Sequence, residues 1–457
     1  MTQTTLSSDA SPAARDLRPM GRLDCDVLVV GGGAAGVAAA CTAAGQGLNV
    51  LLLERYGFCG GAAVAGLSGT VCGLYLARPG AAGGPQKVVH GFVDRFIATM
   101  QRHSGLTAPV RYGDTYTLVH EPLAWRVAAD ELLAESRVRV LFHAQVIAAL
   151  VEGGERVDGV LVNTKEGRFE VRAAVTIDAS GDADVFAMAG LPTTVGQDGK
   201  VQNPTMIFRI AGVDVPRFLQ TYGPDSILPA SVTQALADAH AGGRYWLPRH
   251  KIFLFPTPRA GELLCNCTRI MEPSGAELHP LVAAELSRAE VLGRQQARDY
   301  ARFFRDQLVG CEASYLLDTG VQVGVRQTRQ IVGSQRLTNG DVVSGTKRHD
   351  GIARSPWPIE LHSGSKPRLS WLYEDWYDIP LGCFVPPSGE GLLAAGRCLS
   401  AEHEAMASAR VTAQCFSYGH AIGHAAACVV RERLGVRQVD VAAVRAALVR
   451  EGVALDV

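Results

Sequence analysis

Short, wholly apolar runs alternate along the chain with longer segments of helical character. Residues 26–30 (DVLVV) and 49–54 (NVLLLE) are runs of the kind that is buried in a parallel sheet, and the alanine-rich segment 34–46 between them is typical of a buried helix. This order predicts a βαβ unit with a parallel sheet. Further helices are predicted at about 90–101, 121–136, 279–308 and 412–430.

Three strand-like segments with glycine turns between them lie in the middle of the first half of the chain. Residues 138–151, 156–164 and 168–180 predict a β-meander whose last strand, at 174–179, returns to the parallel sheet. From about 191 to 380 the chain mixes strands with a long polar helix, which indicates an inserted second domain. The predicted fold class is therefore α/β: a Rossmann-like domain whose parallel sheet carries a β-meander, with an inserted α+β domain.

The turn between the first strand and its helix carries the pattern G-x-G-x-x-G. Gly31 permits the tight turn, Gly33 lets a pyrophosphate approach the backbone, and Gly36 lets the helix pack against the strand. The helix points its N-terminal N–H groups at the phosphates, with Ala35 at the same site. Glu54 closes the second strand, where a carboxylate accepts the ribose hydroxyls of an adenosine. The sequence therefore predicts a bound adenine dinucleotide.

The dinucleotide is expected to be FAD rather than NAD. One glycine pattern of this kind occurs in the 457 residues, and it lies near the N-terminus. Gly60 and Gly61 follow the acidic residue within a few positions and offer further bare backbone to a ligand. Because this arrangement is typical of flavoproteins, we expect FAD as the cofactor.

Composition and charge argue against several other ligands and partners. The formal net charge is -1 and the basic residues are scattered, so nucleic acid is not an expected partner. No apolar run is long enough to span a bilayer, so no membrane association is expected. The eleven cysteines are dispersed, as in a reduced cytoplasmic protein. His420 and His424 lie one helical turn apart without a third ligand nearby in the sequence, so no metal site is expected.

Several blocks, in order along the chain, carry a family pattern: VVGGGAAGVAAA, LLLER, CGG, TIDASGDADVFAMAG, GVRQTRQIVG, WPIELH and LLAAGRCLSAEHEAMASARV. From about residue 24 to 455 the chain resembles the FAD-dependent oxidoreductases related to the glutathione reductase and succinate dehydrogenase flavoproteins. The resemblance implies that FAD extends from the first glycine turn to a C-terminal strand and helix. It adds these cofactor contacts to those above: Arg55, Val146, Gly181, Asp182, Gly396 and Arg397.

The composition and the order of the segments predict how the chain is divided. The expected parts are a flexible tail at 1–23, a first part of the FAD-binding domain at 24–190, a substrate domain at 191–380 and a C-terminal part of the FAD-binding domain at 381–457. The last long helix is expected to begin near Val411 and Thr412. Its N-terminus would then stabilise the negative charge that a reduced flavin carries near N1 and the C2 carbonyl.

The flavin performs the electron transfer, so the protein has to place a substrate and handle a proton. His403, in SAEHEA, and His362, in WPIELH, are the candidates for the proton, since a histidine titrates near neutral pH. Arg326, together with Arg329, is a candidate clamp for a carboxylate substrate, and Arg410 is a candidate partner of reduced flavin or a substrate anion. The alternatives are histidines that only hydrogen-bond a loop, and arginines that lie on a solvated helix face or in an interdomain ion pair.

The predicted function is that of an FAD-dependent oxidase or dehydrogenase. It would remove two electrons from a small organic substrate held between the two domains, and oxygen or another acceptor would reoxidise the flavin. One alternative is a flavin monooxygenase driven by NAD(P)H; the other is a flavin-binding protein without catalytic activity. The sequence leaves open the identity of the substrate and whether the chain forms a homo-oligomer.

Overall fold

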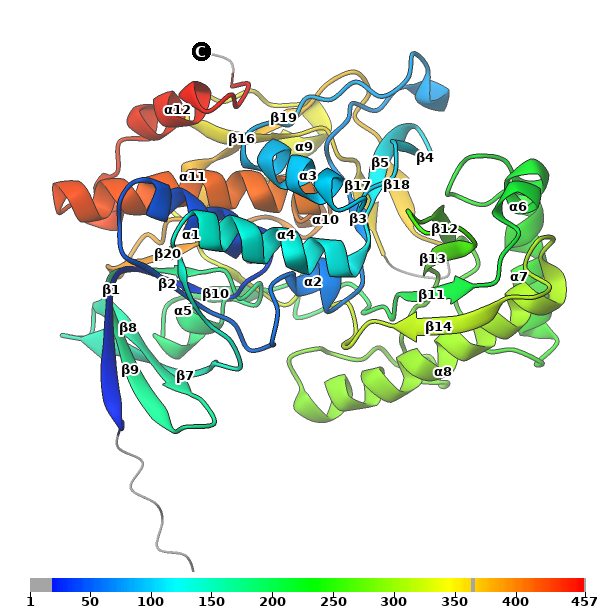
Figure 1. Cartoon of the computed structure of the whole chain (residues 1–457), viewed down its shortest axis with the longest axis horizontal. Helices are drawn as coiled ribbons and strands as arrows, with labels where there is room; N and C mark the ends of the chain where they lie inside the picture. The colour runs from blue at the N-terminus through cyan, green and yellow to red at the C-terminus, as the bar shows by residue number, and fades with distance from the viewer. Residues whose placement is uncertain (1–18, 363–365, 456–457) are drawn as a thin grey trace, which may run out of the picture.

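The structure is a computed structural model that describes residues 19–362 and 366–455 of the chain. The predicted tail at 1–23 falls mostly outside these ranges, and its last residues belong to the first strand, β1 (Gly21–Val30). Figure 1 shows a larger region that contains β1 and a smaller region on the right that contains the long helix α8. The site described below lies where these two regions meet.

A seven-stranded sheet forms the centre of the larger region. Its parallel part follows the order β6 (Arg139–Leu141), β2 (Val50–Leu53), β1 and β9 (Arg168–Asp178), and β20 (Leu392–Ala394) pairs in parallel with the end of β9. The apolar runs are fully buried, as expected of strands covered on both faces. The predicted parallel sheet is therefore confirmed, and the C-terminal part of the chain supplies one of its strands.

The predicted β-meander is confirmed as well. The first half of β9 pairs antiparallel with β8 (Arg156–Asn163), and β8 pairs antiparallel with β7 (Gln145–Glu152). β9 is long enough to belong to both parts: its N-terminal half pairs with the meander, and its C-terminal half pairs with β20. Its carboxyl end consequently lies next to the ends of the parallel strands.

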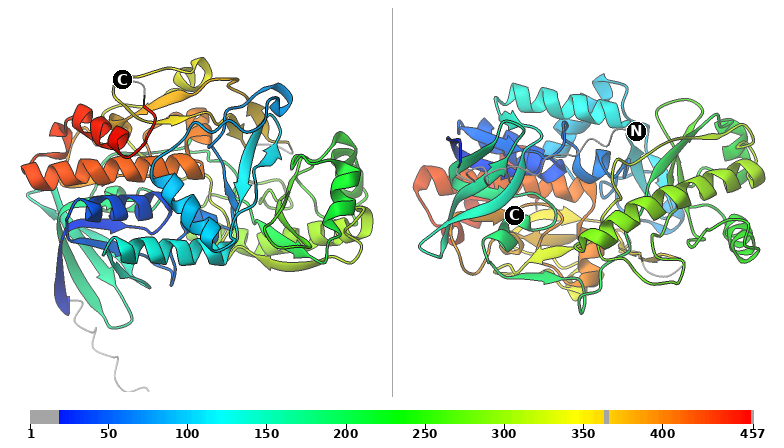
Figure 2. Two further views of the ribbon diagram at one scale, coloured as in Figure 1. Left: turned by 45° about the horizontal axis from the view of Figure 1, so that its top comes forward. Right: turned by 90° about the horizontal axis from the view of Figure 1, so that it is seen from below.

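Helix α1 (Ala34–Gly45) packs closely against the C-terminal helix α11 (Thr412–Glu432). Small residues permit this approach, because a side chain at Gly419 would meet the carbonyl oxygen of Ala35 at 2.0 Å. Helices α3 (Phe92–Arg102) and α4 (Pro122–Glu135) pack on the same side of the sheet (Figures 1 and 2). The predicted helices at 34–46, 90–101, 121–136 and 412–430 are therefore present within a few residues of the expected bounds.

The smaller region has a hydrophobic core of its own, which runs from Met206 to Val323. Its antiparallel sheet has the order β12, β13, β11, β14, and the long helix α8 runs beneath it (Figure 2, right). The elements of this region are β11 (Phe208–Ala211), α6 (Val215–Tyr222), α7 (Ala230–Ala241), β12 (Phe253–Pro256), β13 (Glu262–Asn266), α8 (Ala283–Gln307) and β14 (Tyr315–Thr319).

Hydrophobic residues from Ile331 onward, such as Tyr377 and Ile379, pack into the core of the larger region. The boundaries at residues 191 and 380 stay predictions. The shorter elements are α2 (Gly61–Val64), β3 (Thr70–Val71), β4 (Val110–Tyr112), β5 (Thr115–Val119), α5 (Asp184–Met188), β10 (Thr193–Val195), β15 (Arg329–Ile331), α9 (Asn339–Ser344), β16 (Gly351–Ser355), β17 (Ile359–Leu361), β18 (Arg368–Ser370), β19 (Tyr377–Pro380), α10 (His403–Ala409) and α12 (Val441–Arg450).

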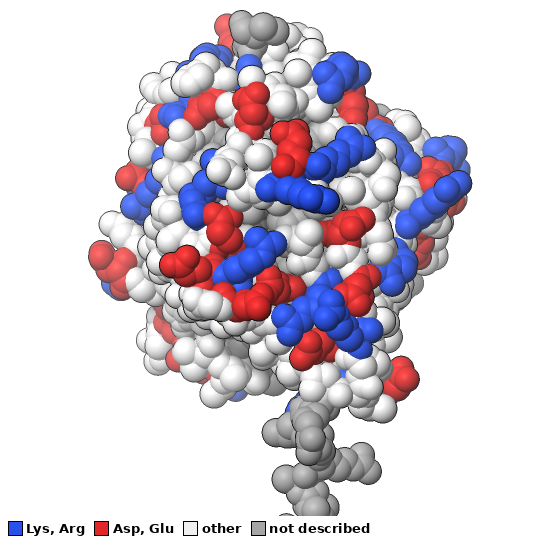
Figure 3. Space-filling view, turned by 90° about the vertical axis from the view of Figure 1, so that its left-hand side faces the viewer, with Lys and Arg blue, Asp and Glu red and all other residues white. Residues whose placement is uncertain are grey.

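Acidic and basic side chains are interspersed on the face shown in Figure 3. Neither sign forms a continuous stripe there, in keeping with the balanced composition. Among the described helices, none combines the length and the apolar character that a membrane crossing requires.

Candidate active site

A pocket of about 440 Å³ lies at the carboxyl ends of the parallel strands. Val30 and Leu53 end β1 and β2, Ala179 and Ala395 follow β9 and β20, and all four residues line the pocket. Leu286 of α8 lines it from the smaller region. The pocket therefore lies where open α/β sheets bind their ligands, between the two regions of the molecule.

The three glycines of the first turn have different surroundings. Gly31 has a φ of +103°, and a Cβ there would lie 2.6 Å from the carbonyl oxygen of Ala179. A Cβ on Gly36 would lie 1.8 Å from the carbonyl oxygen of Gly31, so this glycine lets α1 approach the strand. A Cβ on Gly33 would meet the Cα of Gly61 at 3.9 Å, an ordinary contact, and Gly33 lines the pocket. Gly33 thus presents bare backbone to the pocket at the N-terminus of α1, which fits a diphosphate.

Glu54 follows β2, lines the pocket and is 5% exposed. Its Oε2 accepts a hydrogen bond from the backbone N–H of Gly32 at 2.7 Å, and its Oε1 accepts one from Tyr56 at 2.9 Å. A carboxylate has about four acceptor positions, so two remain for the hydroxyls of a ribose. Burial raises the pKa of Glu54, and the two backbone amides offset this only in part.

The raised pKa of Glu54 predicts that FAD affinity depends on pH. Above this pKa the carboxylate accepts ribose hydroxyls and affinity is at its full value; as the pH falls through it, affinity drops by up to about tenfold per unit. Flavin fluorescence titrations should show this loss in the native protein and not in Glu54→Gln. A pH slope that persists in Glu54→Gln would contradict this assignment and favour another group such as Asp178, whose pKa burial raises to about 6.

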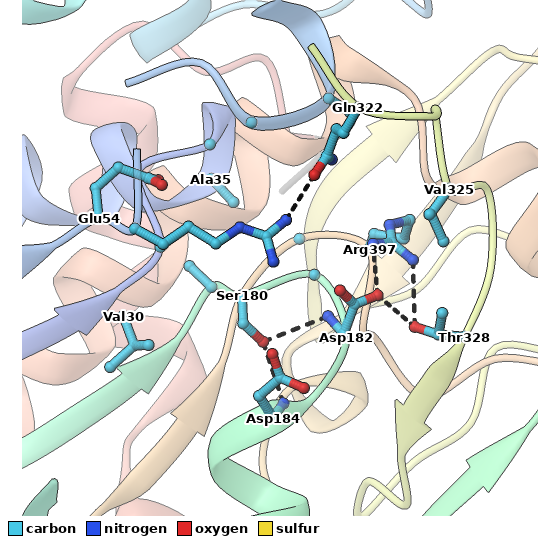
Figure 4. Close-up of a pocket in the computed structure, with 18 of the residues that line it drawn as sticks. Val30, Ala35, Glu54, Ser180, Asp182, Asp184, Gln322, Val325, Thr328 and Arg397 are labelled. Carbon is cyan, nitrogen blue, oxygen red and sulfur yellow. Dashed lines mark hydrogen bonds and ion pairs between the residues drawn. The ribbon is translucent and has the colours of Figure 1, made fainter. Parts of the chain in front are cut away.

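Two carboxylates hold the second turn, which follows β9. Asp178 accepts hydrogen bonds from the backbone N–H and the hydroxyl of Ser180, at 3.0 and 2.6 Å, and from the backbone at the start of α5. Asp182 accepts from Nη2 of Arg397 at 2.7 Å and from the hydroxyl of Thr328 at 2.5 Å (Figure 4). Burial raises the pKa of Asp182, but Arg397 and Thr328 outweigh this and bring it below its ordinary value. The turn is therefore rigid and tied to the C-terminal strand.

Arg55 extends across the pocket toward the smaller region. Its Nη2 donates to Oε1 of Gln322 at 2.9 Å. Gln322 lies in the loop that follows β14, and the backbone N–H of the next residue, Val323, donates to Oε1 of Glu290 in α8 at 2.8 Å. One side of the pocket is thus built by residues that are distant in the sequence from both glycine turns.

Most of the predicted cofactor residues line this pocket: Gly31, Gly33, Ala35, Glu54, Arg55, Gly60, Gly61, Val146, Gly181, Asp182, Gly396, Arg397 and Thr412. Gly36 and Val411 are not among the described residues that line it; Gly36 supports the turn, and Val411 precedes α11. The structure adds lining residues that the sequence did not single out: Ser180, Asp184, Gln322, Val325, Thr328 and Cys415. Ser180 and Asp184 belong to the predicted second turn, and Val325 and Thr328 lie in the block GVRQTRQIVG, whereas Gln322 and Cys415 belong to no motif.

His362 is buried at the end of β17. Its Nε2 lies 2.9 Å from Oε1 of Glu360, which also accepts a hydrogen bond from the hydroxyl of Tyr112 at 2.8 Å. Burial and the charge of Arg326 lower the pKa of His362. Burial raises the pKa of Glu360, but its polar and charged neighbours outweigh this and bring it to about 2. A neutral His362 therefore donates its Nε2–H to an ionised Glu360.

The predicted arginine pair is split between two places. Arg326 is 7% exposed and donates to the backbone oxygen of Asn203 at 2.7 Å, close to His362. Arg329 instead forms an ion pair with Asp184 at 2.9 Å, beside the second turn. The two side chains therefore do not form one clamp. Arg329 forms an ion pair, which was the alternative to a role in substrate binding.

Arg410 lines the large pocket, and its Nη2 donates to Oε1 of Gln202 at 3.2 Å. A second, small cavity is lined by Arg249, Arg326 and His362. His403 is the first residue of α10 and is partly exposed. Among the described residues, it lines neither the large pocket nor this small cavity. Burial lowers the pKa of His403. The structure thus brings His362, Arg326 and Arg410 together and leaves His403 apart from them.

The two histidines of α11 have an acidic partner that the sequence did not indicate. Nε2 of His420 lies 2.6 Å from Oε2 of Glu451, and Nε2 of His424 lies 3.2 Å from its Oε1. Glu451 follows α12, so these contacts join the last two helices. The backbone N–H of Phe92 donates to Nδ1 of His420 at 3.3 Å, which leaves its Nε2 as the donor to Glu451. The assumption that no third ligand is in reach was therefore wrong: His420 forms a hydrogen bond with Glu451, and His424 lies within ion-pair distance of the same carboxylate.

Comparison with known proteins places the chain in a family. The model of the family described as FAD dependent oxidoreductase matches residues 26–448. None of the curated proteins compared with the chain is significantly similar to it. The chain therefore belongs to the FAD dependent oxidoreductases, since the match covers most of its length.

The chain is also similar to several solved structures. The flavin-dependent brominase Bmp2 has a TM-score of 0.50 at 13% identity, with 92% of this chain and 82% of that chain covered. p-Nitrophenol 4-monooxygenase PnpA from Pseudomonas putida DLL-E4 has a TM-score of 0.48 at 13% identity, and the match covers 93% of this chain and 84% of that chain. A geranylgeranyl bacteriochlorophyll reductase-like protein from Thermoplasma acidophilum has a TM-score of 0.48 at 16% identity, and the match covers 90% of this chain and 80% of that chain. At these identities the likeness concerns the fold alone.

The protein is thus an enzyme whose cofactor is FAD, and the predicted fold class and cofactor are confirmed. The residues of the pocket fit this cofactor. Bare backbone at Gly33 suits the diphosphate, and the free acceptor positions of Glu54 suit a ribose. Arg410 and the N-terminus of α11 at Thr412 line the pocket as well, where they suit an anionic reduced flavin.

Proposed function

We propose that this enzyme removes two electrons from a small organic substrate that binds beside Glu360 and His362. The observation that carries the proposal is that the large pocket and the small cavity beside this buried pair are lined by neighbouring residues. Arg410 lines the pocket and donates to Gln202, and the next residue, Asn203, lines the small cavity that also contains His362. A group able to handle a proton therefore lies beside the end of the cofactor site.

The chain holds FAD through two sets of residues. Gly33 and the N-terminus of α1 receive the diphosphate, and Glu54 accepts the ribose hydroxyls. Arg397, fixed by Asp182, and Thr412 at the start of α11 hold the other half. Because Arg397 is already oriented by an ion pair, it loses little side-chain freedom when the cofactor binds.

FAD supplies the two-electron acceptor when it is bound. His362 takes up the proton that the substrate loses. Its Nε2–H is held by Glu360, which leaves Nδ1 as the basic atom, and its lowered pKa keeps it unprotonated at neutral pH. Tyr112 fixes Glu360 in turn. His403 lies outside this arrangement and is not assigned a role in the reaction.

The branch of the FAD dependent oxidoreductases to which the enzyme belongs bears on its reaction. The sequence blocks resemble the glutathione reductase and succinate dehydrogenase flavoproteins, whereas the similar folds described above include a monooxygenase and a brominase. An NAD(P)H-driven monooxygenase is therefore the other outcome of the test below. The alternative of a non-catalytic flavin protein is set aside because the family is one of oxidoreductases.

Anaerobic mixing of the FAD-loaded enzyme with a panel of small metabolites tests the function. We expect at least one compound to bleach the flavin absorbance without any nicotinamide, because the substrate itself is the electron donor. Bleaching that requires NADPH, stimulated by a second compound, would assign the enzyme to the monooxygenases. A protein that takes up no FAD would contradict the cofactor assignment itself.

The role of His362 is tested with the substrate so found. In His362→Ala we expect flavin reduction to slow by about 100-fold or more, which is the usual contribution of a general base, while FAD stays bound. His403→Ala and the surface variant His103→Ala, which removes only a contact with Glu131, should keep the native rate. Stopped-flow absorbance measures all three. An unchanged rate in His362→Ala, or a slow rate in His403→Ala alone, would reverse the assignment.

A further inference from the structure

Two arginines are buried beside His362, and a third connects them to the FAD pocket. Arg249 and Arg326 are 2% and 7% exposed, and Arg410 is partly exposed where it lines the pocket. Arg249 and Arg326 line one small cavity together with His362. Burial lowers the pKa of both buried arginines, and the repulsion of Arg249 and Arg410 adds to this at Arg326. Positive charge is thus concentrated in a place that water hardly reaches.

The partners of these arginines are neutral. Arg249 donates to the backbone oxygen of Lys251 and to Oδ1 of Asn266, both at 2.9 Å. Arg326 also donates to Asn266, at 3.4 Å. Within the part of the chain that the structure describes, Arg249, Arg326 and Arg410 have no ion-pair partner within 4 Å. The carboxylate of Glu360 lies farther than this from all three.

Several donors in the cluster have nothing to bind. Nη2 of Arg249, Nε of Arg410 and Nε2 of Gln202 are buried and have no hydrogen-bond partner among the described residues. Buried charges are normally paired, and a buried donor without a partner costs stability. The single carboxylate of Glu360 cannot balance three guanidinium groups, even if a reduced flavin supplies one further negative charge. The cluster therefore lacks an anion.

We propose that the substrate carries a carboxylate, and that Arg249 and Arg326 bind it while the remainder of the molecule extends toward the FAD pocket. This inference rests on the proposed function, of which it specifies the substrate class. A guanidinium binds a carboxylate through two parallel hydrogen bonds, and Arg326 can offer this geometry in exchange for its long bond to Asn266.

Matched probes test the substrate class without knowledge of the substrate. The FAD-loaded enzyme is titrated at constant ionic strength with formate, acetate and benzoate, and with the neutral acetamide and benzamide. The readouts are the visible absorption of the oxidised flavin and the melting temperature. We expect at least one carboxylate to perturb the flavin spectrum with saturation and to raise the melting temperature, and its amide to do neither.

Variants locate the site. Arg326→Met and Arg249→Met should each weaken carboxylate binding at least tenfold, whereas Arg302→Met, which removes an exposed arginine of α8, should leave it unchanged. If one variant does not fold, the other variant and the amide comparison on the native enzyme still decide.

Equal binding of a carboxylate and its amide, no response to any carboxylate, or equal competition by chloride would each overturn the proposal. A yellow protein that fails these tests contradicts the substrate class alone, while a protein without FAD contradicts the function on which it rests.

Discussion

Replacement of Gly33 by valine should abolish FAD binding while the protein still folds. Gly33 has φ −71° and ψ −176°, an extended conformation that valine adopts, and a Cβ there has no contact closer than 3.9 Å. The added methyl groups, however, would occupy the place where the backbone meets the diphosphate. We expect FAD affinity to fall by about 100-fold or more, equivalent to roughly 2.7 kcal/mol, while the loss of a good helix N-cap costs about 1 kcal/mol of stability.

Two other glycines provide the controls for this experiment. Gly45→Val lies at the exposed end of the same helix, where an added Cβ contacts nothing within 4 Å, and should bind FAD normally. Gly36→Val should damage the fold as well as FAD binding, because its Cβ would lie 1.8 Å from a carbonyl oxygen. FAD titration and circular dichroism of the apoprotein separate these outcomes. Normal FAD affinity in Gly33→Val would show that the diphosphate does not approach this turn.

Most of the predicted cofactor residues line one pocket, and this grouping has a local cause. Gly31, Gly33 and Glu54 lie on a single βαβ unit, and the geometry of such a unit follows from the order of its strands and helix. The turn at Gly181 was predicted for the same reason, since it follows a buried strand of the same sheet. Local pattern is sufficient when one supersecondary element builds the site.

The part of the site that lies between the two regions could not be predicted in this way. Arg249 and Asn266 belong to the smaller region, and Gln322 lies in a loop after β14. No spacing in the sequence relates these residues to His362, because only the packing of one region on the other brings them together. The split of Arg326 from Arg329 has the same origin: three residues apart in an extended segment, they face different neighbours.

The surroundings of the two candidate histidines differ in a way that residue type does not reveal. His403 and His362 both lie in blocks that resemble the flavin face of the family, and both were predicted as candidates for the proton. In the structure His362 has a buried carboxylate partner and lies among arginines, whereas Nδ1 of His403 has no hydrogen-bond partner among the described residues. A hydrogen-bonded partner is what orients an imidazole for proton transfer, and this property is not visible in a sequence.

Removal of the negative charge of Glu360 should be strongly destabilising. Glu360 lies in the buried cluster that contains Arg326 and Arg410, and its carboxylate also holds His362 and Tyr112. In Glu360→Gln the guanidinium groups lose their nearest compensation, and loss of one partner from a buried ionic cluster costs about 3 kcal/mol. We expect a corresponding fall in the denaturant midpoint of the FAD-loaded enzyme. Glu131→Gln, which removes a surface ion pair with Arg102, should leave the midpoint nearly unchanged.

The pH dependence and a double variant make this last prediction specific to charge. Because the pKa of Glu360 is lowered to about 2, its contribution is fully present above the pKa of an unfolded glutamate, about 4.3, and is lost as the pH falls toward 2. The difference in stability between native enzyme and Glu360→Gln should therefore be constant from neutral pH to about 5 and shrink below about 4. Addition of Arg326→Met should recover part of the loss, since one uncompensated cation disappears with it. If the double variant is less stable than Glu360→Gln alone by the full cost of a second buried truncation, Glu360 acts by packing and not by its charge.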